Sequence, residues 1–309
     1  MPPLSERQLC ALSIDMDPLD HYLHARGYEP LATTNLNAVY DDALPRFLDL
    51  FDQYGVRATF FVVGKDALAP QNRRRLREVA ERGHEVANHT YSHHQTFRAL
   101  SAADKRHEIV EADKILSDCV GRRLEGFRAP GWGVDLTTLE ILEDLRYTYD
   151  SSVLPSRALS WIAAANHVLN RGRLAKSLHS SLGRAPKVPY RPAREALWRR
   201  GDMRLLELPP TVLPLVQFPF LGTLLYMLGK RPFALSLWYL RWFSQPLLYE
   251  LHGIEQVDYH TEVRDPRLAV KPGLKKPLAE KTELYRFMLS SFSARHDFVT
   301  MQELAGRYA

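Results

Sequence analysis

Hydrophobic positions in the first half of the chain alternate between short apolar stretches and amphipathic stretches with a helical period. Apolar residues at i, i+3, i+4 and i+7 predict a helix that ends at Gly55: Leu44, Phe47, Leu48 and Phe51. Further helices are expected to end at Gly83 and Gly121. Five stretches rich in β-branched and aromatic residues are expected to be strands: 8–15, 56–64, 84–89, 124–130 and 147–152. This alternation predicts a parallel sheet or barrel.

The pattern changes after residue 153. Residues 154–204 are basic and irregular, and strands resume at 205–209 and 246–253. A helix near 278–291 and a strand at 296–301 close the chain. We therefore expect one domain over residues 1–309, with an inserted basic and apolar segment at about 154–245.

Basic residues are concentrated between residues 157 and 200. Ten Lys and Arg face one acid, Glu195, so this segment carries a formal charge of +9, whereas the whole chain carries +5. Such a block indicates a local anionic partner, such as a phosphate or a membrane surface, and argues against nucleic-acid binding. Three of the ten lie well inside it: Arg171, Arg173 and Lys176.

Ionisable residues recur where the predicted strands end. They are Asp15, His89, Arg128, Asp150 and His252. In (β/α) barrels the active site is built at the carboxyl ends of the strands. The sequence therefore predicts a catalytic site at this edge.

Two histidines and a pair of aspartates have the composition of a metal site. His89 and His93 are four residues apart, and one carboxylate would complete three ligands with an open position, as in catalytic zinc sites. Asp15 and Asp17 in IDMD supply the carboxylates. We expect strand alternation to separate them, so that one binds metal and the other stays free as a base.

Six motifs occur in one order: ALSIDMD, ATFFVVG, RGHEVANHTYSHH, GFRAPGWG, YDSS and LHG. Together they resemble the polysaccharide deacetylase (NodB-homology) family of metal-dependent amide hydrolases. HTYSH after VANH is the most specific motif, and RAPGW is next. The resemblance covers roughly residues 8–150 and 205–305, and it implies a deformed, TIM-like (β/α) barrel that hydrolyses an N-acyl group of an amino sugar.

The resemblance also implies roles for the residues of the metal site. Asp15 corresponds to the general base, and Asp17, His89 and His93 to the ligands of a divalent ion. Zinc is the expected ion, with cobalt, manganese, nickel and iron as alternatives. The commonest family pattern has adjacent aspartates, and Met16 occupies the second place here. The roles of Asp15 and Asp17 could therefore be exchanged, and the spacing resembles the branch that acts on intracellular and lipid-linked substrates.

Further roles follow from the later motifs. Arg128 corresponds to the arginine that orients the base, and His252 to the general acid. Gly131 and Trp132 lie where a backbone N–H would face the oxyanion. Asp150 departs from the commoner motif and is either a substrate contact or a residue that caps a turn.

A long apolar stretch interrupts the second half of the chain. Residues 208–229 contain no charge, but four prolines would break a membrane helix, and a crossing there would separate Arg128 from His252. In residues 224–246 aromatic residues such as Trp238 and Trp242 mix with cations, which suits a bilayer interface. Covering the barrel or contacting another subunit are the alternatives. We expect peripheral contact with an anionic membrane and a lipid-linked amino sugar as substrate, for example on undecaprenyl phosphate.

Two cysteines, Cys10 and Cys119, are too few and too far apart for a disulfide framework. No apolar leader precedes the first strand, so a cytoplasmic protein is expected, at the inner face of the membrane if it binds lipid.

Three other functions are open on sequence alone. An allantoinase-like hydrolase of a small amide would use the same residues. Two histidines and a carboxylate also form the facial triad of non-haem iron oxygenases. A binding module that has lost its activity is the third alternative. The sequence does not determine the oligomeric state.

Overall fold

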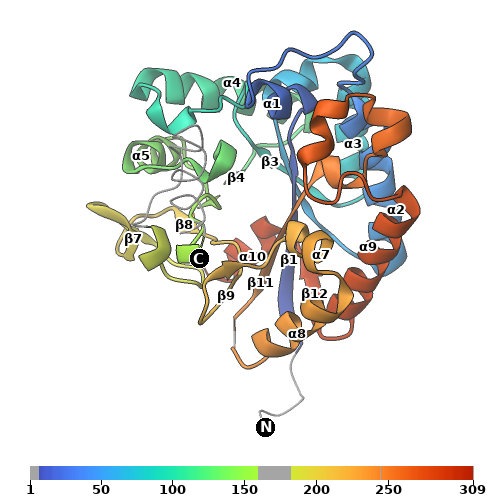
Figure 1. Ribbon diagram of the computed structural model, residues 1–309. Coiled ribbons are helices and arrows are strands. Elements are labelled where there is room, and N and C mark those ends of the chain that lie inside the picture. The colour runs from blue at the N-terminus through green and yellow to red at the C-terminus, as the bar shows by residue number, and fades with distance from the viewer. Residues whose placement is uncertain (1–6, 159–181, 244, 309) are drawn as a thin grey trace.

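The fold is built on one curled parallel sheet with helices on its outer face (Figure 1). The computed structural model describes residues 7–158, 182–243 and 245–308. Eight strands form the sheet: β1 (Gln8–Met16), β2 (Thr59–Val62), β3 (Glu85–Asn88), β4 (Gly126–Phe127), β5 (Tyr149–Asp150), β8 (Leu206–Glu207), β11 (Leu247–His252) and β12 (His296–Val299). All of their pairings are parallel.

The strand order is that of an incompletely closed barrel. It runs β11-β1-β2-β3-β4-β5-β8, and β12 pairs with the beginning of β1. The backbone N–H of Thr211, which follows β8, donates to the carbonyl of Leu248 in β11 at 2.9 Å and so links the two ends of the order. The predicted deformed (β/α) barrel is confirmed.

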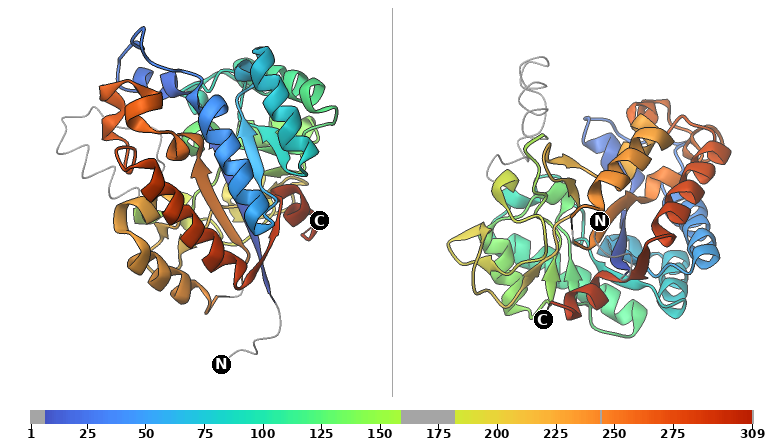
Figure 2. Two further views of the ribbon diagram at one scale, coloured as in Figure 1. Left: turned by 90° about the vertical axis from the view of Figure 1, so that its right-hand side faces the viewer. Right: turned by 90° about the horizontal axis from the view of Figure 1, so that it is seen from below.

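Nine α-helices lie in the described part of the chain. They are α1 (Leu19–His24), α2 (Leu44–Tyr54), α3 (Pro70–Glu81), α4 (Ala102–Val120), α5 (Leu136–Asp144), α7 (Gly222–Leu228), α8 (Lys230–Leu240), α9 (Leu278–Ser293) and α10 (Met301–Gly306). Figure 2 shows α2 beside α9 along the outside of the sheet. Gly55 and Gly121 end α2 and α4 in the left-handed conformation, as the sequence predicts, and the Ser101 hydroxyl caps the start of α4.

The two faces of the sheet have separate cores. Cys10, Leu12 and Ile14 of β1 belong to the larger core, which the helices cover. Ala11 of β1 and Phe61 of β2 belong to a smaller core on the inner face, which α10 closes. Residues that alternate with the outer set, such as Ser13 and Asp15, therefore face the interior of the barrel.

The predicted insertion is interrupted by a strand of the main sheet. β8 pairs with β5, in the register Asp150 with Glu207. Two small hairpins flank it: β6 (Pro192–Ala193) with β7 (Ala196–Arg200), and β9 (Val212–Leu213) with β10 (Phe218–Pro219). Three predicted basic residues lie outside the described residues: Arg171, Arg173 and Lys176.

Candidate metal centre and active site

Three predicted ligands converge at the edge where the parallel strands end. Asp17 follows β1, His89 follows β3, and His93 lies in the next loop with a φ of 54°. The Oδ1 atom of Asp17 lies 3.3 Å from Nε2 of His89 and 3.1 Å from Nε2 of His93. All three side chains are buried. The structure thus brings together three residues that are distant in sequence, with their ligand atoms facing one another.

Neighbouring groups fix the orientation of these side chains. The Nδ1 atom of His89 lies 2.7 Å from the carbonyl oxygen of Arg128, which can only accept, so Nδ1 donates and Nε2 presents its lone pair to Asp17. The Tyr22 hydroxyl donates to Oδ2 of Asp17 at 2.6 Å. Nδ1 of His93 is 2.9 Å from Nδ1 of His21. Such outer contacts are typical of metal ligands.

The donor set fits a divalent cation. Oδ1 of Asp17 is buried and has no hydrogen-bond partner in the structure, and the two imidazole nitrogens lie on either side of it. Burial would raise the pKa of Asp17, but the neighbouring charge of His93 and the close approach of the His89 and His93 imidazoles lower it well below its usual value. The carboxylate is therefore held in the ionised form that a cation requires.

Asp15 lies beside this group and pairs with Arg128. Nη1 of Arg128 donates to Oδ1 of Asp15 at 2.5 Å, and the other oxygen, Oδ2, is 3.9 Å from Nε2 of His89. The guanidinium also donates to Ser13 and Ser151 and stacks on Phe61, so its position is fixed from several sides. Arg128 is buried, and its three guanidinium nitrogens all donate hydrogen bonds.

Strand alternation does not separate the two aspartates, so that expectation is wrong. Residues two apart on a strand share a face, and both Asp15 and Asp17 approach His89. The difference between them lies in their partners, since Asp15 pairs with Arg128 whereas Asp17 contacts the two imidazoles and Tyr22.

His252 is opposite Asp15 across the β1–β11 pairing. Its side chain is 19% exposed, more than the other charged groups of the site. Nε2 lies 3.8 Å from Oε1 of Glu250, and Nδ1 lies 3.9 Å from Oε1 of Glu255. An imidazole between two carboxylates at an open position can hold a proton and reach a bound molecule.

The turn after β4 holds Gly131 and Trp132, both with positive φ. The Trp132 N–H donates to the carbonyl of Ala129 at 3.1 Å, so this amide is already occupied. The Trp132 indole N–H donates to Glu250 at 3.1 Å, which links the turn to β11. Gly131 is exposed and is the one of the two residues whose surroundings leave room for a ligand.

Asp150 does not join the group. It is fully buried, accepts a hydrogen bond from the Ser152 hydroxyl at 2.5 Å, and stands in register with the buried Glu207. Because it has no exposed surface, it cannot touch a substrate in this structure. The turn-capping alternative agrees with its contact to Ser152.

Three neighbours of the site were not predicted from the sequence: His21, Tyr22 and Glu250. His21 and Tyr22 come from α1, directly after the DxD motif, and contact His93 and Asp17. Burial, followed by the charge of His93, lowers the pKa of His21 to about 3. Burial raises the pKa of Glu250 to about 7, although Arg128 opposes this. A polar residue two positions before His252 on a strand was the available signal for Glu250.

Comparison with known proteins agrees with the resemblance. Residues 29–149 match the family model described as polysaccharide deacetylase. The peptidoglycan deacetylase of Helicobacter pylori is 26% identical over 153 residues, which are 49% of this chain and 51% of the relative. The chitooligosaccharide deacetylase of Sinorhizobium fredii is 35% identical over 97 residues, covering 30% of this chain and 44% of the relative. The chain thus spans about half or less of the curated relatives it matches.

Solved structures show the same fold over nearly the whole chain. A putative polysaccharide deacetylase from Mycobacterium smegmatis has a TM-score of 0.59 at 18% identity, covering 98% of this chain and 91% of that one. PuuE allantoinase also has a TM-score of 0.59, at 15% identity, covering 100% and 92%. The resemblance recognised in the motifs is therefore confirmed: residues 29–149 are similar to the polysaccharide deacetylase family, and the chain shares the fold of a solved structure of that kind.

Proposed function

We propose that this protein is a metal-dependent hydrolase that removes an N-acyl group, acetyl or formyl, from an amino sugar. One observation carries the proposal. Oδ1 of Asp17 faces two imidazole nitrogens at 3.1 and 3.3 Å, directly beside an ion-paired second aspartate, at the edge where the strands end. A metal ligand set adjoining a separate carboxylate is the arrangement that amide hydrolysis by water requires.

Asp17, His89 and His93 would hold the ion, with zinc as the expected metal and cobalt, manganese, nickel or iron as alternatives. When bound, a divalent ion of this kind acidifies water and polarises the amide carbonyl. The chain's own contribution is the orientation of the ligands, which the contacts of His89 to Arg128 and of Asp17 to Tyr22 provide.

Asp15 acts as the general base in this proposal. Its Oδ1 accepts from Arg128, and its Oδ2 points toward His89, so one oxygen is left to take a proton from the attacking water. Arg128 fixes the position of the carboxylate through its hydrogen bond to Oδ1. The distances support this assignment over the exchanged one, because Asp17 is the carboxylate that contacts both imidazoles.

His252 would protonate the departing amine. An amine leaves an amide as the neutral molecule, so a donor must reach its nitrogen. The partly exposed imidazole of His252 meets this requirement, because its ring lies between Glu250 and Glu255 at an open position. We retain Gly131 as the backbone donor to the oxyanion and no longer assign that contact to Trp132, whose N–H is occupied.

Relatives supply the substrate class. The matching proteins include a peptidoglycan deacetylase and a chitooligosaccharide deacetylase, and from them we infer an N-acylated amino sugar as the substrate. Since these relatives match over part of their length, the assignment to this chain is a proposal. The fold shared with PuuE allantoinase is compatible with hydrolysis of a small amide, but a shared fold does not favour that substrate over an amino sugar.

Peripheral contact with an anionic membrane is also proposed. α8 exposes Leu235, Trp238 and the adjoining Trp242, at 64%, 48% and 52% exposure. The guanidinium of Arg241 lies 4.8 and 5.1 Å from the ring centroids of Trp238 and Trp242. Exposed aromatic rings interleaved with a cation suit the headgroup region of an anionic bilayer.

This surface and the candidate site lie at different ends of the sheet. α8 precedes the beginning of β11 and lies near the start of β1 in Figure 1, whereas the site is at the strand ends. Membrane contact through α8 would anchor the protein but would not itself place a lipid in the site. The lipid-linked form of the substrate, with undecaprenyl phosphate as an example, and the cytoplasmic location stay predictions from the sequence.

Release of acetate or formate tests the proposal directly. The zinc-loaded protein should release acetate from N-acetylated glucosamine oligomers, and a chelator should stop the release. Turnover under strictly anaerobic conditions separates hydrolysis from an oxygenase. If no N-acylated amino sugar is hydrolysed with any of the five metals, the proposed function is wrong.

A further inference from the structure

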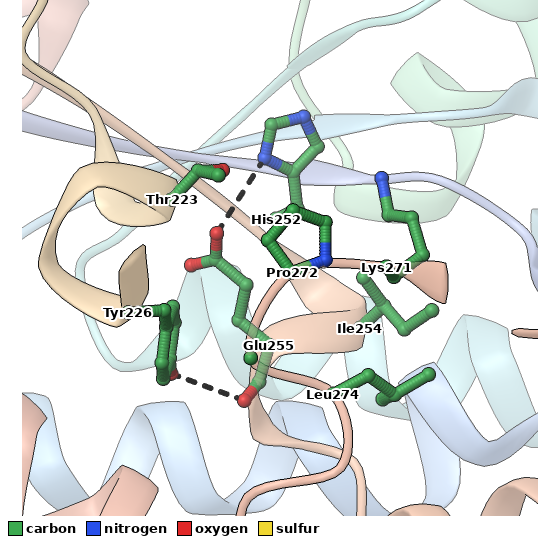
Figure 3. Close-up of a pocket in the computed structure, with 9 residues that line it drawn as sticks. Thr223, Tyr226, His252, Ile254, Glu255, Lys271, Pro272 and Leu274 are labelled. Carbon is green, nitrogen blue, oxygen red and sulfur yellow. Dashed lines mark hydrogen bonds and ion pairs between the residues drawn. The ribbon is translucent and has the colours of Figure 1, made fainter. Parts of the chain in front are cut away.

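A cavity opens beside His252, next to the candidate metal site. It is small, with a volume of about 70 Å³, and lies between α7 and the segment 271–274. Figure 3 shows Thr223 and Tyr226 of α7 on one side and Lys271 on the other, with the Lys271 ammonium pointing toward the end where the His252 ring lies. The cavity therefore adjoins the group that we assign to the departing amine.

Lys271 is the cation of this cavity. Its aliphatic stem is half-buried, and its Nζ lies 3.9 Å from the centroid of the Tyr22 ring. Among the described residues, no carboxylate oxygen comes within ion-pair distance of this ammonium. Burial lowers the pKa of Lys271, although Asp17 and Glu255 oppose the shift. A partly desolvated cation without a direct carboxylate partner costs free energy unless a ligand supplies an anion.

The nearest acid of the cavity is engaged elsewhere. Oε2 of Glu255 accepts from the Tyr285 hydroxyl at 2.6 Å, and its Oε1 faces His252 at 3.9 Å. The Tyr226 hydroxyl donates to the Glu255 backbone carbonyl at 3.2 Å, as Figure 3 shows. The remaining lining is largely apolar, with Ile254 and Leu274. The cavity thus offers one available positive charge among apolar walls.

The direction of the cavity fixes which part of a substrate would enter it. If His252 meets the amine nitrogen, substituents on the sugar carbons near that nitrogen extend into the space beside His252. We propose that Lys271 binds an anionic group, a carboxylate or a phosphate, that the amino sugar carries near its N-acyl group. This inference rests on the proposed function and narrows its substrate class to acidic N-acyl amino sugars.

Equilibrium binding without turnover tests the inference. Calorimetric titrations in the presence of a chelator compare N-acetylglucosamine, which is neutral, with N-acetylmuramic acid, which adds a carboxylate, and with N-acetylglucosamine 1-phosphate. One charge-assisted contact predicts binding of at least one acidic ligand about tenfold or more tighter than the neutral sugar. The two acidic ligands distinguish a carboxylate from a phosphate as the anion.

Variants assign the preference to one side chain. Lys271→Met should abolish the preference for the acidic ligand, and Lys271→Arg should retain most of it. Lys275→Met, which removes an exposed lysine of the same segment, is the matched control and should bind as the wild type does. Equal binding of neutral and acidic sugars by the wild type would overturn the inference, as would a preference that survives in Lys271→Met.

The two proposals fail in different ways. An acidic-ligand preference that depends on Lys271, without acyl release from any sugar under any metal, sustains the anion site and overturns the hydrolase. Acyl release that is equally efficient for neutral and acidic sugars sustains the hydrolase and overturns the anion site.

Discussion

Asp15 and Asp17 lie on one face of one strand end, yet their surroundings give them different chemistry. Arg128 holds Asp15 at 2.5 Å, whereas Tyr22 and two imidazoles surround Asp17. A carboxylate paired with a fixed guanidinium through one oxygen keeps its other oxygen free, which suits a base. A carboxylate with an unpaired buried oxygen between two imidazole nitrogens suits a metal ligand.

Replacement of Asp15 should therefore separate catalysis from metal binding. Asp15→Asn keeps the size of the side chain and removes its ability to take a proton. We expect kcat to fall about 10²–10⁴-fold, the usual contribution of a general base, with metal content unchanged. Metal analysis and steady-state kinetics on the same preparation give both readings. Loss of bound metal in Asp15→Asn would instead indicate that the roles of the two aspartates are exchanged.

The sequence identified the residues with chemical motifs but not those that support them. Asp17, His89 and His93 could be found because each follows a recognisable strand. Tyr22 and His21 lie on α1, and they reach the site because the chain turns back after β1. The hydrophobic pattern of the sequence does not predict the direction of that turn. Asp150 lies at a strand end, as the other predicted site residues do. Its carboxylate is buried against β8 instead, and β8 comes from a segment far away in the sequence.

At the scale of elements, the pairing of β5 with β8 brings two buried carboxyl groups side by side. Asp150 and Glu207 are in register, and neither side chain is exposed. The Val153 N–H donates to Oε1 of Glu207 at 3.0 Å, while Oε2 of Glu207 and Oδ2 of Asp150 have no other partner in the structure. Burial, together with the neighbouring Asp150 carboxylate, raises the pKa of Glu207 well above its usual value. We therefore expect the carboxyl groups of Asp150 and Glu207 to share one proton in the folded protein.

This pair makes the stability of the fold depend on pH. Because the pKa of Glu207 is raised in the folded state, its stabilising effect is complete below the unfolded pKa of about 4.3 and is lost as pH rises through the folded pKa. Glu207→Gln keeps the hydrogen bonds without ionising. Its gain in unfolding free energy over the wild type should grow from pH 5 to pH 9, with a slope of at most about 1.4 kcal/mol per pH unit.

Denaturant titrations at several pH values measure this slope. Glu195→Gln, an exposed glutamate on the turn between β6 and β7, is the matched control. A gain for Glu207→Gln that is the same at every pH would show that the pair does not carry a shared proton.

Element boundaries were predicted best where a local signal exists. Gly55, Gly121 and Ser101 mark the helix ends that the structure shows. The expected strand at 124–130 is reduced to Gly126–Phe127. Pro130, which lacks an N–H, begins a turn soon after this strand, and a Cβ on Gly126 would lie 2.0 Å from the Tyr149 ring. Such tertiary packing is not visible in hydrophobic periodicity.

At the scale of the whole molecule, the candidate active site lies at one end of the barrel, and the exposed apolar face of α8 lies toward the other end. The site lies where the strands end, and α8 leads into the start of β11. Within the described residues, none of the helices combines the length and apolar character needed to cross a bilayer. The apolar stretch of the second half instead contributes short helices and hairpins, as its prolines predicted.

Vesicle flotation tests whether the exposed face of α8 binds lipid. The protein should float with vesicles that contain anionic phosphatidylglycerol at low salt, and high salt should weaken binding because it screens the contribution of Arg241. Trp238→Ser with Trp242→Ser should reduce binding about tenfold or more. Leu68→Ser removes a side chain that is 54% exposed on another part of the surface and is the control. If wild type and double variant float equally, the face has another function.

The central claim is that Asp17, His89 and His93 hold one divalent ion, and metal content of purified variants measures it most directly. After zinc loading and removal of excess ion, the wild type should retain one ion per chain, and Asp17→Asn and His93→Ala should retain almost none. His94→Ala, which changes the exposed histidine next in sequence, should load as the wild type does. Full loading of Asp17→Asn or His93→Ala, or a wild type that retains no metal, would contradict the account.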